Sequence, residues 1–342
     1  MLGKPTPLGL HLPSPGVSLL WDTTAVAIGY FERRKRRRAI EEGLRRQLRA
    51  DIARLLREQP DLLAAASGQR EVTVGAGHVR VAGTAGSGLT GADYGAGEDG
   101  SGRVARTQAS ASGSAADGAA RALAAAADAA RARAGTVLGL AGELLVLWNA
   151  PFDQRDHHVR ACRHALQAVE AARDAAGGAV ELTCGVATGT VSLAVAGEGA
   201  DTGFVAVGPP LDLASELARF AAAVGVAVVA TEETVTAARG GVLAREIDMV
   251  AVEIERNRLR VFEVLGDPSE FETYAPRFEH YGAGLAAYRA RNWAEARRCF
   301  ERALEACPDD GPAAVMIARC KRLESDPPPP EWTPVTVLRD LR

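Results

Sequence analysis

The stretch that decides the fold is FVAVGPPLDLASEL, residues 204–217. Its pattern is that of an apolar strand, a glycine turn and an amphipathic helix. The turn carries Pro209 and Pro210 where a catalytic loop would carry a polar side chain, and the helix carries Asp212 and Glu216 one turn apart. We expect strand and helix to belong to the core, with these side chains facing inward: Val205, Val207, Leu211, Leu213, Ala214 and Leu217.

Outward from this stretch, strand-like and helix-like segments alternate over residues 67–266. An alanine-rich segment predicts a helix at 115–134, and a second helix is expected at 156–172. Residues 89–114 are low in complexity and rich in Gly and Ser, which indicates a surface insertion. The order of segments predicts an α+β sheet with its helices on one face. The expected strands lie at 70–83, 136–151 (a hairpin turning at 141–143), 180–197 (a pair broken at Thr188-Gly189), 226–230, 245–254 and 258–265.

Residues 1–66 form a first region, which has a Pro/Gly-rich lead followed by a basic segment. Apolar residues recur there in steps of three and four, which predicts one amphipathic helix ending near Pro60. Arg33–Arg38 are six consecutive cations, which we interpret as a solvated helix start, with contact to anionic lipid or nucleic acid as the alternative. The apolar positions of this helix are Ile40, Leu44, Leu48, Ile52, Leu55 and Leu56.

Residues 267–342 form a third region, in which small and aromatic residues have the spacing of one tetratricopeptide hairpin. Pro308 would end its second helix. Each repeat of this kind must bury its face on a neighbour, so we expect the lone hairpin to pack on the preceding domain. The sequence DPPPPEW, residues 326–332, predicts a stiff terminal linker. The side chains expected to join the two helices are Tyr288, Trp293, Ala296, Phe300 and Ala303.

Composition excludes several classes of protein. Of the 342 residues 47% are hydrophobic, which predicts a packed core, and the net charge of −3 gives no chain-wide attraction to nucleic acid. The five cysteines are odd in number and show no CxxC spacing, which argues against a disulfide framework or zinc site and for a reducing compartment. No secretory signal is visible, and the best apolar run, residues 16–31, is shorter than the roughly 20 residues of a spanning helix. We expect a cytoplasmic protein, with peripheral membrane contact through Arg33–Arg38 as the alternative.

Two local features resemble binding sites but have simpler explanations. The adjacent His157 and His158 would point in different directions on a helix. We therefore expect a solvated helix start with Asp156 as its N-cap, and no metal pair. The glycine-containing loop at residues 83–88 has no lysine and no defined helix start, so a phosphate-binding loop is not expected.

Together these segments resemble the class III adenylate/guanylate cyclase catalytic domain. The most similar subgroup is bacterial cyclases in which sensor and membrane segments lead through a basic helix into the domain. The likeness spans roughly residues 30–320 and implies a ferredoxin-like α+β fold, with the N-terminal amphipathic helix and the C-terminal tetratricopeptide-like hairpin attached. The motifs that carry it are GQREVTV (68–74) after the basic helix, GELLVLWNAPFDQRDHHVRACRHAL (142–166), GVATGTVSLAVAG (185–197), FVAVGPPLDLASELA (204–218) and VFEVLGDP (261–268).

The resemblance implies two metal positions, because in this family two aspartates hold two metal ions that activate the ribose hydroxyl and bind the triphosphate. These positions fall at His78 and Glu143. A neutral imidazole supplies neither the charge nor the bridging oxygens that magnesium requires. Glutamate keeps the charge but moves the carboxylate by about 1 Å, and a misplacement of that size can cost ~100-fold. We expect no cofactor, and Mg or Mn held weakly at Glu143 only if activity remains.

The resemblance also implies an asparagine and an arginine one helical turn apart, which orient the ribose and neutralise the charge that develops on the phosphate. They fall at Asp212 and Glu216. Replacing arginine by glutamate reverses the sign where the transition state is anionic, so a stabilising group becomes a repelling one. The base-selecting positions fall at Gly203 and Glu253. Every matched catalytic position has changed, which argues against nucleotide binding.

Three functions remain open. The leading hypothesis is a catalytically silent cyclase homologue in cyclic-nucleotide signalling, acting as a homodimer or as a heterodimer with a related cyclase. Because active sites of this family are composite, with metals from one subunit and the asparagine and arginine from its partner, both sites of such a heterodimer would be incomplete. The second is a weakly active adenylate cyclase converting ATP to cyclic AMP and diphosphate. The third is a scaffold whose tetratricopeptide-like hairpin binds a partner peptide.

Overall fold

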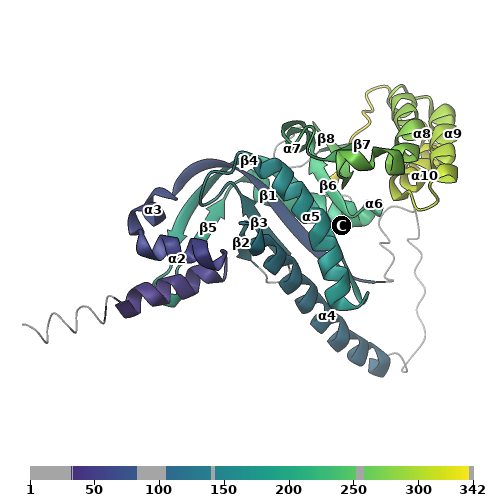
Figure 1. Cartoon of the computed structure of the whole chain (residues 1–342). Helices are drawn as coiled ribbons and strands as arrows, with labels where there is room; N and C mark the ends of the chain where they lie inside the picture. Colours follow the sequence, from purple (N-terminus) through teal and green to yellow (C-terminus); the bar gives the residue numbers. More distant parts are fainter. Residues whose placement is uncertain (1–31, 33, 83–104, 140–142, 252–257, 339–342) are drawn as a thin grey trace, which may run out of the picture.

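The computed structural model describes residues 32, 34–82, 105–139, 143–251 and 258–338. Within them a nine-stranded sheet has the order β2-β3-β1-β4-β6-β8-β7-β9, with β5 paired to β4 beside this row (Figure 1). The pairs β4–β6 and β7–β9 are parallel and the others antiparallel. The strands are β1 (Gly68–Val81), β2 (Thr136–Gly139), β3 (Glu143–Trp148), β4 (Val180–Ala196), β5 (Gly203–Val207), β6 (Val228–Thr231), β7 (Leu243–Ala251), β8 (Arg258–Gly266) and β9 (Thr336–Val337).

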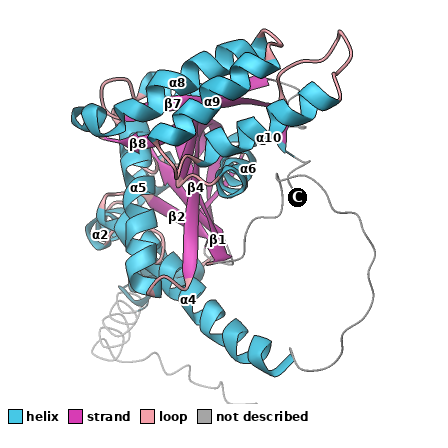
Figure 2. Cartoon of the chain, turned by 90° about the vertical axis from the view of Figure 1, so that its right-hand side faces the viewer, coloured by secondary structure: helices cyan, strands magenta, loops and turns pink. Residues whose placement is uncertain are grey.

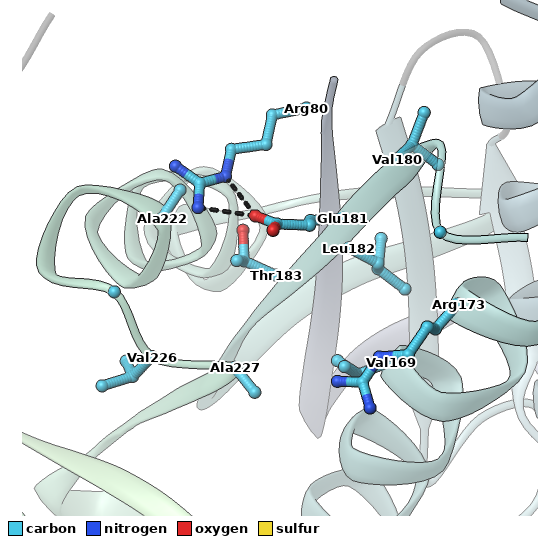
Figure 3. A pocket seen from close by; sticks show the side chains of 12 residues that line it. Arg80, Val169, Arg173, Val180, Glu181, Leu182, Thr183, Ala222, Val226 and Ala227 are labelled. Carbon is cyan, nitrogen blue, oxygen red and sulfur yellow. Dashed lines mark hydrogen bonds and ion pairs between the residues drawn. The ribbon is translucent and has the colours of Figure 1, made fainter. Parts of the chain in front are cut away.

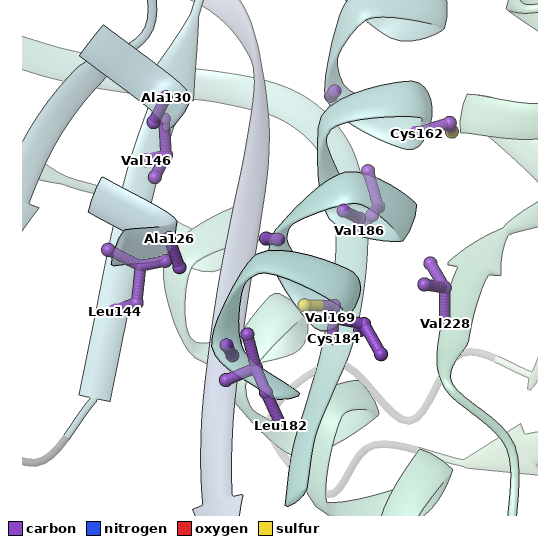
Figure 4. Packing of buried hydrophobic residues seen from close by; sticks show 14 of the residues in the cluster. Ala126, Ala130, Leu144, Val146, Cys162, Val169, Leu182, Cys184, Val186 and Val228 are labelled. Carbon is purple, nitrogen blue, oxygen red and sulfur yellow. The ribbon is translucent and has the colours of Figure 1, made fainter. Parts of the chain in front are cut away.

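Four strands and two helices form a ferredoxin-like unit. The chain order is β1-α4-β2-β3-α5-β4 and the spatial order is β2-β3-β1-β4, antiparallel throughout. Helices α4 (Ala105–Ala132) and α5 (His157–Ala176) share one buried cluster with this sheet. Small side chains such as Ala126 and Ala130 let α4 lie close to the strands (Figure 4). The expected ferredoxin-like α+β fold is confirmed.

Helix α6 (Pro209–Val224) packs on the opposite face of the sheet, so that α5 and α6 lie on either side of it (Figure 2). Two glycines of β4 allow this close approach. A Cβ on Gly185 would lie 2.0 Å from the carbonyl oxygen of Ala214, and one on Gly189 would lie 2.8 Å from Cγ of Pro210. The expectation that all helices lie on one face is therefore wrong, because β1 and β4 are apolar on both faces.

Strand β4 is unbroken, and the break expected at Thr188-Gly189 is wrong. Both residues stay in register with β1, opposite Thr73 and Val72. The orientation expected for β5 is also wrong, since Val205 and Val207 are 48% and 74% exposed. Successive side chains of a strand alternate between faces. Phe204, which is buried, takes the inward position, while Ala214 and Leu217 are buried as expected.

The expected single N-terminal helix is interrupted. Residues 34–45 are helical, and α2 (Ala50–Glu58) and α3 (Pro60–Ala65) follow after a break at residues 46–49. The break has a tertiary cause: the side chain of Gln47 donates to the carbonyl of Phe204 and accepts from its N–H, at 2.9 and 2.6 Å. Apolar periodicity alone does not reveal this pairing with a distant strand.

The basic segment that leads into this region lies at the surface. Residues 34–38 are exposed, while Arg33 and the Pro/Gly-rich lead lie outside the described residues. Peripheral membrane contact through Arg33–Arg38 therefore stays a prediction. In the described part of the chain, every helix is too short or too polar to cross a bilayer.

The tetratricopeptide-like hairpin is present as α8 (Phe271–Arg289) and α9 (Trp293–Ala306), and a third helix that was not expected, α10 (Gly311–Ser325), follows. As expected, the hairpin packs on the preceding domain, where Tyr281 and Phe300 share a buried cluster with residues of α6, β7 and β8. The hydroxyl of Tyr281 donates to the carbonyl of Ile247 at 2.7 Å. The remaining helix, α7 (Glu232–Ala237), is a short segment after β6.

The proline-rich tail, which was expected to be a stiff terminal linker, packs against the C-terminal helices instead. Trp332 packs edge-on against Tyr288 and Trp293, with ring centroids 5.6 and 4.9 Å apart. A run of prolines leaves its carbonyls unpaired, and the guanidinium of Arg291 donates to three of them. Strand β9 then pairs with β7 at the edge of the sheet.

Candidate functional site

The two positions expected to hold metal lie side by side. His78 of β1 and Glu143 of β3 are directly opposite in the antiparallel register, and opposite residues point to the same face. Val74 and Ala76, which share the face of His78, belong to the cluster that α6 covers. The sheet thus presents this pair of side chains toward α6.

Arg219 of α6 links this pair to the helix. Its Nη2 lies 3.7 Å from Oε1 of Glu143, and its Nη1 lies 3.6 Å from Oε1 of Glu216. A guanidinium therefore stands between an acid of the expected metal site and an acid of the expected transition-state site. The sequence analysis missed Arg219, although its position three residues after Glu216 on a helix is a signal for such pairing.

The charge of Arg219 acts on both His78 and Glu143. Burial, and then the charge of Arg219, lower the pKa of His78, against the opposing effect of Glu143. The imidazole is therefore neutral at neutral pH. Oε1 of Glu143 is shielded from solvent and accepts no hydrogen bond from the described residues. A shielded carboxylate oxygen of this kind is costly unless a cation approaches it, and Arg219 is that cation here.

The two positions on α6 have different surroundings. Asp212 is exposed in the first turn of the helix, after Pro209 at its start. Proline suits that place because its fixed φ is helical and the first turn needs no N–H donor. Glu216, one turn on, is half-buried and pairs with Arg219. The structure links Glu216 to Glu143 through Arg219 and leaves Asp212 at the surface.

Packing accounts for the glycine at the first base-selecting position. A Cβ on Gly203 would lie 2.9 Å from Oε1 of Gln47, whose amide holds the backbone of Phe204. A side chain at this position would displace the end of the Gln47 side chain from these hydrogen bonds. The second position, Glu253, lies outside the described residues.

A cleft of about 350 Å³ lies at the ends of β1 and β4, beside α5 and α6 (Figure 3). Arg80 and Glu181, paired residues of β1 and β4, lie side by side in its lining, with Nε of Arg80 donating to Oε2 of Glu181 at 2.8 Å. The hydroxyl of Thr183 donates to the carbonyl of Ala218 at 2.8 Å. Since these polar groups already bond to protein partners, we assign no reaction to the cleft.

The histidine pair differs from the expectation. His157 is buried, and its ring lies against that of His158, with centroids 3.7 Å apart. Asp156 is the N-cap residue but makes no capping hydrogen bond, and instead accepts one from Arg160. The view that the two rings are solvated and point apart is therefore wrong. The burial of His157 has a tertiary cause, a contact with Thr73.

A comparison with protein families identifies one segment of the chain. A sequence profile described as tetratricopeptide repeat matches residues 278–310, which span most of α8 and α9. No curated protein sequence matches the chain at a significant level. The matching segment supports the expected helical hairpin.

Several solved structures of nucleotide cyclases resemble the chain. The match to the guanylyl cyclase Cya2 covers 60% of this chain and 97% of the Cya2 chain, with 17% identity and a TM-score of 0.44. The match to the adenylyl cyclase CyaB from P. aeruginosa covers 59% of this chain and 96% of the CyaB chain, with 17% identity and a TM-score of 0.44. The match to a bacterial light-regulated adenylyl cyclase covers 74% of this chain and 66% of that cyclase, with 11% identity and a TM-score of 0.46. At these identities the likeness concerns the fold alone.

Proposed function

We propose that the protein is a catalytically silent, nucleotide-cyclase-like protein of cyclic-nucleotide signalling, which acts by pairing with a related cyclase or with a second copy of itself. The observation that carries the proposal is Arg219, whose guanidinium lies between Glu143 and Glu216. Glu143 stands at a metal position and Glu216 at a transition-state position, and in the composite sites of this family one chain supplies these two positions to two different sites.

The residues at the metal positions do not fit a two-metal site. Two-metal phosphoryl transfer requires hard anionic oxygens at both positions. Here His78 is a neutral imidazole, and the single carboxylate, Glu143, already faces a guanidinium. Arg219 supplies the positive charge that an ion would bring, so no magnesium or manganese takes part in the proposed function.

On helix α6, the two positions matched to the asparagine and the arginine both carry acids. Transition-state stabilisation in phosphoryl transfer comes from cations placed where negative charge develops. Glu216 is an acid at this place, and Asp212 is a second acid one turn before it. Both would repel a triphosphate.

One observation favours weak activity as a second candidate function. Oε1 of Glu143 accepts no hydrogen bond from the described residues, so a single metal ion that displaced Arg219 would find a free ligand atom. The protein would then be a weak adenylate cyclase, converting ATP to cyclic AMP and diphosphate. Its activity would depend on Glu143, which separates it from the silent alternative.

For pairing, the surface around β5 is the proposed contact. Val205 and Val207 are exposed on this strand, which pairs only with β4 among the described strands and leads directly into α6. Exposed apolar side chains on an edge strand favour association with another chain. We predict that wild-type protein forms dimers and that the double variant Val205→Lys/Val207→Lys is monomeric, as measured by light scattering during size-exclusion chromatography.

The matched control is Val81→Lys, which adds a charge at an exposed valine of β1 and should leave the dimer intact. Co-expression with an intact cyclase tests the pairing with a relative. A mixed dimer leaves both composite sites incomplete, so cyclic-nucleotide production should fall, and the double variant should not lower it. A rise in production on co-expression would contradict the proposed role.

A further inference from the structure

Three potential metal ligands meet away from the cyclase-like site. Glu71 of β1 and the first two residues of α5, His157 and His158, place one ligand atom each within 4.8 Å of one another. They lie on the α5 face of the sheet, because Glu71 shares its face of β1 with Thr73, which contacts His157. His78 and Glu143 point to the other face, so the two sites are separate.

The geometry is close to that of a bound ion. Zinc–nitrogen and zinc–oxygen bonds of about 2.0–2.2 Å place tetrahedral ligand atoms about 3.4 Å apart. Nε2 of His157 and Oε1 of Glu71 are 3.9 Å apart. The Glu71 side chain is 60% exposed, and a shortening of this distance by about 0.5 Å would give the spacing of a bound ion's ligands.

His157 is oriented by a chain of hydroxyl groups. Its Nδ1 lies 2.8 Å from Oγ1 of Thr73, which lies 3.0 Å from Oγ1 of Thr188, and Thr188 continues to Thr234 at 2.9 Å. When Nδ1–H donates to Thr73, each hydroxyl can donate to the next one along the chain. Nε2 then carries the lone pair and faces Glu71. Ligand histidines in proteins have such an outer hydrogen bond, which fixes the tautomer and the ring orientation.

The local charges suit a cation. Burial, and then the neighbouring His158, lower the pKa of His157 to about 4, against the carboxylates of Glu71 and Asp156. Burial also lowers the pKa of His158. The start of α5 carries partial positive charge, which the carboxylate of Glu71 offsets.

We propose that Glu71, His157 and His158 bind one divalent transition-metal ion of the zinc class, with water completing the coordination. Two imidazoles and one carboxylate form a ligand set for zinc or cobalt, and a poor one for magnesium or calcium, which prefer oxygen ligands alone. This site is independent of the proposed cyclase-like function. It joins the N-terminus of α5 to β1 and would stabilise that contact.

The test is titration of the full-length protein with Co²⁺, followed by visible absorption, and with Zn²⁺, followed by calorimetry. We expect one ion per chain, with the absorption intensity of four- or five-coordinate cobalt. Glu71→Gln and His158→Gln change side chains outside the core, and each should weaken binding by more than the about 10–100-fold that loss of an outer hydrogen-bond partner costs. His280→Gln, on α8, is the matched control and should bind as the wild type does.

The variants must first show wild-type unfolding transitions in the absence of metal, so that lost binding reports the site. Wild-type protein that takes up no cobalt or zinc would overturn the proposal. Equal binding by Glu71→Gln and the wild type would also overturn it. If binding were instead lost in Glu143→Gln and kept in Glu71→Gln, the ion would belong to the other face of the sheet, and this proposal would be wrong.

Discussion

At the residue scale, Asp310 shows how one buried charge fixes the C-terminal helices to the sheet. Its two carboxylate oxygens accept hydrogen bonds from Arg245 of β7 at 2.7 and 2.8 Å, and one also accepts from the N–H of Ala313 at the start of α10. Burial opposes the charge of Arg245, but the bonds and charges of Asp310 and Glu263 raise its pKa above its ordinary value. Arg245 therefore stays charged and depends on its partners.

We predict that Asp310→Ala lowers the free energy of unfolding by about 3–5 kcal/mol, because it leaves the Arg245 charge buried with one partner fewer. Urea unfolding followed by circular dichroism measures this change. The adjacent Asp309→Ala is the matched control. Asp309 is 79% exposed in its ion pair with Arg277, and an exposed pair contributes less than about 1 kcal/mol. Similar losses in the two variants would contradict this account.

Only some residues of the candidate site could be predicted from the sequence. Motif order identified His78, Glu143 and Glu216, and the fold brings all three to one side of the sheet. The role of Arg219 was not accessible, because it depends on how α6 crosses β1 and β3. The same limit applies to His157, whose burial depends on a hydroxyl from β1.

At the element scale, the contact of α6 with β4 explains why the segment at residues 204–217 keeps its pattern. Pro210 lies over Gly189, and the backbone of Ala214 lies over Gly185. Pro210 and Ala214 are therefore needed for packing, independently of any role of Asp212 and Glu216. Apolar pattern and turn signals predicted the strand and the helix, but they did not show which face of the sheet the helix covers, because both faces of β4 are apolar.

We predict that Gly185→Ala destabilises the protein by about 1–3 kcal/mol or more, because the new methyl group overlaps the backbone of α6 and forces it away. Thermal and urea unfolding measure the loss. Gly75→Ala on β1 is the matched control, since a Cβ there meets no atom within 4 Å, and its stability should stay close to that of the wild type. A neutral Gly185→Ala would show that α6 does not pack on β4 as described.

At the scale of the whole molecule, the buried residues form three clusters that share elements. Residues of α6 belong to the cluster with the C-terminal helices and also to the cluster with β1 and the N-terminal helices. The boundaries predicted from composition near residues 66 and 266 stay predictions, since nothing in this packing isolates the regions. The ferredoxin-like unit was implied by the resemblance to the cyclase catalytic domain, while the order of segments alone predicted only an α+β sheet. The sequence did not predict that the proline-rich tail packs back on the domain, because this packing depends on the contacts of Trp332 with Tyr288 and Trp293.

For the whole chain, we expect a cyclase-like fold without cyclase chemistry. The measurement that tests it most directly is a cyclase assay on the purified full-length protein, supplied with ATP or GTP and with Mg²⁺ or Mn²⁺, with cyclic product detected by mass spectrometry. Glu143→Ala, prepared in the same way, measures the contribution of contaminating enzymes. The account predicts no more cyclic nucleotide from the wild type than from Glu143→Ala. Product that appears with the wild type and disappears with Glu143→Ala would contradict it, and would show that Glu143 holds a working metal ion despite Arg219.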